Sequence, residues 1–151
     1  MASRTTPPLL GLLLALLLPP ALASLQSAAG DGDLAGVIAA LAAGANIDGF
    51  EGERTALTAA AEGGHYDVVE YLLDEGASID LREKSKFTAL MLAAQGGHLD
   101  VVRLLVERGA DVTATKTQTN DALHYAIQGA HLDVACYLAA LVDISGVDFS
   151  E

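Results

Sequence analysis

Residues 88–98 read TALMLAAQGGH, and Val101-Val102, Leu104-Leu105 and Gly109-Ala110 follow them. The same landmarks recur on both sides of this stretch, separated by 32 or 33 residues. They are the triplets at 55–57, 88–90 and 121–123, the pairs at 32–33, 64–65, 97–98 and 130–131, and the Gly-Ala pairs at 44–45, 76–77 and 109–110. Several landmarks that share one period indicate an internal structural repeat.

Each repeat predicts two short helices. Leu57, Ala60 and Ala61 share one face of a first helix, which Gly63-Gly64 should end. A second helix then follows, with an apolar stripe at Val68, Val69, Leu72 and Leu73. Gly76 stands where a left-handed C-terminal cap is expected.

Helices of about nine residues are too short to be stable alone in water, so neighbouring repeats must cover their apolar faces. Alanines in the first helix permit close packing, and leucines and valines in the second fill the next layer. We therefore expect an all-α repeat solenoid of about four helix-turn-helix repeats, in which contacts join neighbours only.

The residues quoted above resemble an ankyrin repeat. The resemblance covers residues 25 to about 148 and implies β-hairpin-like loops between the helix pairs. It places repeats at 24–52, 53–84, 85–118 and 119–151, of which the first is a shortened cap and the last a degenerate cap. The sequence departs from the family pattern by having alanine at 56, 89 and 122, where proline is usual. The histidine that usually follows is present only as His124.

Residues 1–23 have the layout of a secretory signal peptide. Arg4 precedes the apolar run LLGLLLALLL at 9–18, and Ala21-Leu22-Ala23 forms an A-x-A cleavage site. The alternative is a transmembrane anchor, but a helix needs about 20 apolar residues to cross a bilayer, and Pro19-Pro20 interrupts this run. We expect cleavage before Ser24 and export, to the periplasm in a Gram-negative bacterium or otherwise to the secretory-pathway lumen or the exterior.

The chain is strongly acidic, with 8 Lys and Arg against 20 Asp and Glu and a net charge of -12. Loss of Arg4 with the leader leaves seven bases and a net charge of -13. This charge argues against nucleic-acid binding, which needs clustered bases, and it favours a protein partner with a basic surface. We expect no stable membrane insertion after cleavage. One cysteine, Cys136, excludes an intrachain disulfide.

Three histidines, His65, His98 and His131, occupy equivalent places in successive repeats. Packed helices lie about 8–10 Å apart, whereas zinc ligands lie about 2 Å from the metal. These histidines therefore cannot readily share one metal ion. The family resemblance instead implies a structural role, in which each histidine ties neighbouring loops together.

Other candidate chemistry is weaker. Cys136 with His131 and Asp133 could form a nucleophile set, but the helical spacing is wrong and we expect a partly buried, inert cysteine. Asp31-Gly32-Asp33 resembles the start of a calcium loop without its further acids. The paired acids Glu51 and Glu53, and Asp74 and Glu75, suit a solvated surface better than a catalytic pair. We expect no catalytic, cofactor-binding or metal-binding residues.

The connections at 48–54, 80–87 and 113–120 contain five of the seven bases outside the leader. These are Arg54, Arg82, Lys84, Lys86 and Lys116, and Phe50 and Phe87 accompany them. Loops on one face of a repeat stack are often its binding face. The alternative is that these side chains pack between neighbouring hairpins or only aid solubility.

By position, the family resemblance implies a protein-binding surface on the hairpin tips and the exposed side of the first helices. Its residues would be Glu51, Arg54, Glu62, Lys84, Ser85, Phe87, Gln95, Thr117, Gln118, Asn120 and Gln128. The predicted function is an exported protein–protein interaction module without catalytic activity. The alternatives are an inhibitor or immunity protein against an exported toxin or enzyme, an accessory factor that stabilises an exported enzyme, and a small metal-binding protein or enzyme.

Overall fold

The computed structural model describes residues 24–117 and 120–146, with side chains as far as residue 142. Within these residues the regular secondary structure consists of helices, apart from an isolated bridge between Glu51 and Arg54, and loops and turns connect the helices. The helices are α2 (Leu25–Gly30), α3 (Leu34–Ala42), α4 (Ala56–Gly63), α5 (Tyr66–Asp74), α6 (Ala89–Gly96), α7 (Leu99–Glu107), α8 (Ala122–Gln128) and α9 (Leu132–Gly146). The predicted leader lies outside the described residues.

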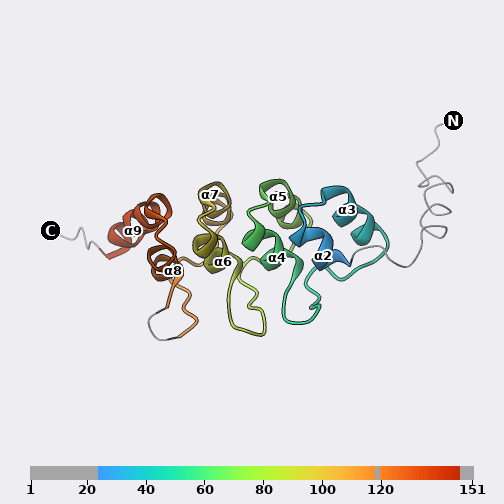
Figure 1. Cartoon of the computed structure of the whole chain (residues 1–151), viewed down its shortest axis with the longest axis horizontal. Helices are drawn as coiled ribbons and strands as arrows, with labels where there is room; N and C mark the ends of the chain where they lie inside the picture. The colour runs from blue at the N-terminus through green and yellow to red at the C-terminus, as the bar shows by residue number, and fades with distance from the viewer. Residues whose placement is uncertain (1–23, 118–119, 147–151) are drawn as a thin grey trace.

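The helices form two rows (Figure 1). One row contains the first helix of each pair, α2, α4, α6 and α8, and the other contains α3, α5, α7 and α9. Each first helix packs against the first helices of adjacent pairs and against its own second helix. The predicted all-α repeat solenoid is confirmed, and each helix pair falls within one of the four predicted repeats.

The recurring triplet at 55–57, 88–90 and 121–123 begins each first helix from α4 onward. The side chains of Thr55, Thr88 and Asp121 accept hydrogen bonds from backbone N–H groups three residues later, at 3.2, 3.3 and 2.8 Å. Thr58 also accepts a hydrogen bond from the Thr55 N–H at 3.0 Å and completes a capping box. These bonds satisfy N–H groups that have no partner within the helix.

The turn inside each of these helix pairs needs a left-handed residue. Gly64 and Gly97 have φ angles of 71° and 74°, and Ala130 has a φ of 60° at the equivalent place. The predicted end of α4 at Gly63-Gly64 is therefore confirmed, and the fourth repeat makes the same turn with alanine. That alanine carries a steric cost, because its Cβ approaches the following carbonyl oxygen.

The core lies between and within the rows. Ala60, Ala61, Ala93 and Ala94 are fully buried, so adjacent first helices approach closely. In the second row the predicted stripe is confirmed, since Val68, Val69 and Leu72 are buried and Leu73 is partly buried against the core. The large side chains of the second helices fill the space that the alanines leave.

The two end repeats differ from the middle ones. The first helix α2 has only 6 residues, as predicted, whereas α9 has 15 and is longer than the 9-residue helices α5 and α7. Ile127 and Leu132 are 62% and 75% exposed, in line with their place in the last described repeat. The C-terminal end of the stack therefore presents apolar side chains.

Candidate protein-binding surface

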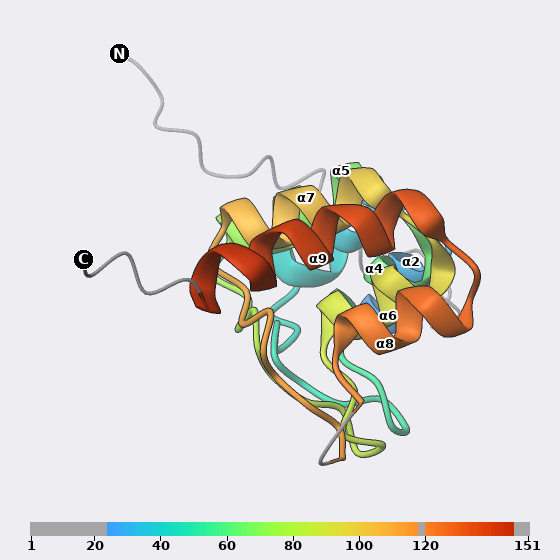
Figure 2. The ribbon, with the colours of Figure 1, turned by 90° about the vertical axis from the view of Figure 1, so that its left-hand side faces the viewer.

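The loops between helix pairs project together to one side of the helices (Figure 2). We call the described parts of these loops, residues 48–54, 80–87, 113–117 and 120, the hairpin row. Each loop closes through its backbone: Glu51 and Arg54 exchange hydrogen bonds of 3.0 and 3.3 Å, the Glu83 N–H donates to Phe87 O at 3.0 Å, and the Lys116 N–H donates to Asn120 O at 2.9 Å. The expected hairpin-like loops are therefore present.

Hydrogen bonds also join successive loops. The Lys84 N–H donates to the Glu53 carbonyl oxygen at 3.1 Å, and the Ser85 hydroxyl donates to the Glu53 carboxylate at 2.9 Å. On the other side, Nη1 of Arg82 donates to the carbonyl oxygen of Thr115 at 2.7 Å. The hairpin row is therefore one connected surface, preformed before any partner binds.

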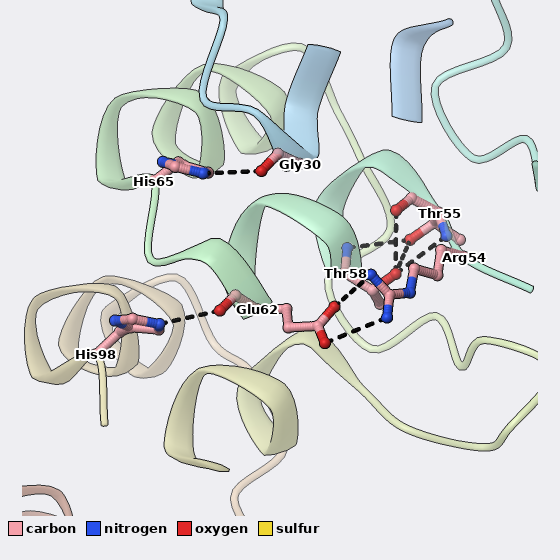
Figure 3. Close-up of polar contacts among 7 residues, drawn as sticks. All are labelled: Gly30, Arg54, Thr55, Thr58, Glu62, His65 and His98. Atoms are coloured by element: carbon pink, nitrogen blue, oxygen red, sulfur yellow. Dashed lines mark hydrogen bonds and ion pairs between the residues drawn. The ribbon is translucent and has the colours of Figure 1, made fainter. Parts of the chain in front are cut away.

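Arg54 and Glu62, two of the predicted binding residues, bind each other. Their nearest nitrogen and oxygen lie 2.5 Å apart, and Nη2 donates to the second carboxylate oxygen at 3.2 Å (Figure 3). The two side chains are 54% and 41% exposed. Both can meet a partner, but they present a neutral pair and not a free positive charge.

Phe87 packs between neighbouring loops. Its ring centroid lies 5.1 Å from that of Tyr125 on α8, and the Lys116 ammonium lies 3.7 Å from the Phe87 centroid. Phe87 is only partly exposed. The alternative given in the sequence analysis, packing between neighbouring hairpins, therefore describes Phe87. Its side chain joins the loop at 80–87 to the following repeat. Phe50, in contrast, is 46% exposed.

The remaining predicted binding residues fall into two groups. Glu51, Lys84, Gln95, Thr117 and Gln128 are exposed, whereas Ser85 and Asn120 are partly buried. Gln118 lies outside the described residues. The exposed members line the hairpin row and the C-terminal ends of α6 and α8.

The three histidines each contact the preceding repeat. Nε2 of His65 lies 2.9 Å from Gly30 O, and Nε2 of His98 lies 2.9 Å from Glu62 O (Figure 3). His131 repeats the contact with Gln95 O at 3.0 Å. These contacts agree with the structural role that the resemblance implies. Among the described residues there is no group of three or more His, Cys, Asp or Glu that could hold a metal ion.

The expectation that Cys136 is partly buried is wrong, because its side chain is exposed. The buried face of α9 is formed by Val134, Ala135 and Leu138, and Cys136 lies off that face. In α7 the equivalent position holds Arg103, which is also exposed. The fold thus exposes Cys136, although cysteine is a residue type that is usually buried.

Sequence reasoning missed Glu83 as a residue of interest. It is only 8% exposed, and its Oε2 atom is buried without a hydrogen-bond partner. Burial raises the pKa of this carboxyl group above its ordinary value, and this effect outweighs the attraction of Arg54. The one signal in the sequence was that Glu83 is the single acid among three bases in 81–87.

The ankyrin-repeat family model, three copies of the repeat, matches residues 25–116 and again 79–148. The chain belongs to the ankyrin-repeat family. Ankyrin repeats indicate a protein–protein interaction module, and the family is typically non-catalytic. Within the described residues no helix of this ankyrin-repeat chain is long and apolar enough to cross a membrane.

One similar protein is the ankyrin repeat and KH domain-containing protein mask-1 of Caenorhabditis elegans. The two are 44% identical over 59 residues, which is 39% of this ankyrin-repeat chain and 2% of the worm protein. The chain therefore spans only a very small part of that relative.

Proposed function

We propose that this ankyrin-repeat chain is an exported module that binds a protein partner through the hairpin row and the exposed ends of α6 and α8. The observation that carries this proposal is the set of loop-to-loop hydrogen bonds, Lys84 and Ser85 to Glu53 and Arg82 to Thr115. A prealigned surface loses little conformational entropy on binding. The module has no catalytic activity of its own in this proposal.

The charges support a partner with a basic surface. The net charge of the chain is -12, which steers positively charged proteins toward it. Several bases of the hairpin row already have contacts within the protein: Arg54 binds Glu62, Arg82 binds Thr115 O and Lys116 lies over Phe87. Glu51 remains exposed beside them.

Export rests on the signal-peptide layout of residues 1–23. Within an exported binding module, two narrower roles remain as predictions: an inhibitor or immunity protein, and an accessory factor for an exported enzyme. A tight one-to-one complex that abolishes an enzymatic or toxic activity would support the inhibitor. Loss of a neighbouring enzyme's activity on deletion of this chain would support the accessory factor.

The direct test is affinity capture with immobilised residues 24–151 and an extracytoplasmic extract, followed by mass spectrometry. A surface variant would combine Lys84→Ala, Gln95→Ala, Thr117→Ala and Gln128→Ala, which are all exposed. A matched control would combine Glu75→Ala and Glu107→Ala, exposed residues of the second helix row. We expect a protein that the parent and the control retain and the surface variant loses. Loss by the control with retention by the surface variant would refute the assigned surface.

A further inference from the structure

Glu83 lies at the centre of the hairpin row and organises its middle loop. Its backbone N–H donates to Phe87 O at 3.0 Å, and its carbonyl oxygen accepts from the Lys86 N–H at 2.8 Å. The next residue, Lys84, donates its N–H to Glu53 of the preceding loop. The backbone on both sides of the Glu83 side chain therefore closes the middle loop and joins it to the preceding loop.

The Glu83 carboxyl group is poorly suited to carry a charge. The residue is 8% exposed, and Oε2 is buried without a hydrogen-bond partner. Burial of a carboxylate with an oxygen that lacks a hydrogen-bond partner is costly, whereas the neutral acid loses much less on leaving water. Protonation removes the charge and turns one oxygen into a donor.

The charges around Glu83 have opposite effects on its carboxylate. Arg54 and Lys116, from the preceding and following loops, stabilise the carboxylate. Glu62 on α4 and Glu53 on the preceding loop destabilise it. Arg54 is already bound to Glu62, and Lys116 lies over the Phe87 ring. The loop of Glu83 itself adds Arg82, Lys84 and Lys86, of which Arg82 donates to Thr115 O.

We propose that Glu83 makes the hairpin row pH-responsive, because its carboxyl group takes up a proton in acid and stabilises the middle loop, and releases that proton as the pH rises and loosens the loop. The direction of this pH response follows from the linkage between proton binding and folding. The pKa is raised in the folded state, so the folded protein binds this proton more tightly than the unfolded chain does. The contribution of Glu83 to stability is therefore greatest in acid and is lost as the pH rises through the raised pKa.

The pH response concerns the chain alone and does not depend on a partner. Its consequence for binding rests on the proposed function: if the hairpin row is the binding surface, the captured partner should bind more tightly in mild acid. Failure of the capture experiment would leave the pH response itself testable, so the two proposals fail separately.

The first test is an NMR titration of the side-chain carboxyl carbons in residues 24–151. We expect Glu83 to titrate at a higher pH than the ordinary value of a glutamate side chain. In parallel, the protection factors of the Lys84 and Lys86 amides should fall several-fold as Glu83 loses its proton. Titration of Glu83 at or below the ordinary value of a glutamate side chain would overturn the proposal.

The second test uses Glu83→Gln, which is nearly isosteric and cannot ionise, with Glu75→Gln as the matched control. We expect Glu83→Gln to melt about 3 °C or more above the parent at neutral pH, and the two to converge in acid. The control should keep the parent's pH profile. A Glu83→Gln variant whose melting temperature follows the parent's pH profile, or lies below it at neutral pH, would also overturn the proposal.

Discussion

Nε2 of His98 lies 2.9 Å from the backbone carbonyl oxygen of Glu62, which belongs to the preceding repeat. His65 and His131 make the same contact with Gly30 and Gln95. The imidazole of His98 also lies against Gly64, where an added Cβ would come within 2.4 Å of Nδ1. Since Gly64 has a φ of 71°, its conformation favours glycine, and the space for the histidine requires it.

His98→Ala should lower the free energy of unfolding by about 1–3 kcal/mol, because it leaves a partly buried carbonyl of the preceding repeat without its partner. Urea denaturation of residues 24–151 measures this. His124→Ala is the control, since His124 is exposed on α8 and should change stability by less than about 0.5 kcal/mol. Equal losses in the two variants would contradict the structural role of His98.

Leu72→Ala and Leu105→Ala should each cost about 2–5 kcal/mol, as large-to-small changes at buried leucines do. Both side chains have no exposed surface and lie in equivalent places on α5 and α7. Thermal unfolding followed by circular dichroism would show the loss. Melting temperatures equal to that of the parent would mean that the buried faces of the second helices are assigned wrongly.

Ala130→Gly should stabilise the protein by about 0.5–1 kcal/mol, because Ala130 has a φ of 60° and glycine removes the left-handed penalty. The entropy that glycine adds to the unfolded chain offsets part of this gain. Ala43→Gly is the matched control, since Ala43 caps α3 with a φ of -78° and glycine there brings only the entropic loss. Denaturant unfolding should therefore shift the two variants in opposite directions.

Arg54→Ala should change stability by less than about 1 kcal/mol, because exposed ion pairs contribute little. Its partner Glu62 is exposed as well, so breaking this pair leaves neither of its charges buried. Arg54 also attracts the buried Glu83 carboxylate, so the comparison is made in a Glu83→Gln background, which removes that attraction. Adding salt should reduce even this small difference. A loss of several kcal/mol in low-salt urea unfolding would show that the pair has a structural role beyond its surface geometry.

If residues 1–23 direct export as proposed, the recovered protein should begin at Ser24, since the A-x-A site ends at Ala23. Intact-mass spectrometry of the protein recovered from the exterior or the periplasm checks this. Ala21→Arg, which disrupts the cleavage site, should give a longer product. A recovered protein that still carries Met1 would contradict cleavage and favour the membrane anchor.

Much of the architecture was predictable because it depends on short-range rules. The end of the first helix at Gly63-Gly64 and the apolar stripe of the second helix at Val68, Val69 and Leu72 were predicted from patterns within a few residues, and both are confirmed. The loop surface was less predictable. Phe87 was a candidate binding residue, yet it contacts Tyr125 and Lys116, and Cys136 was expected to be partly buried but is exposed.

The sequence by itself determined the repeat, its two helices and the turn between them, because periodicity, caps and left-handed residues act within one repeat. Only the tertiary structure decided which loop residues form contacts within the protein. Lys84 meets Glu53 and Arg82 meets Thr115, each across two successive loops, and Phe87 meets Tyr125 on α8 of the following repeat. Stacking brings these residues together, and it also buries Glu83 among the charges of three loops.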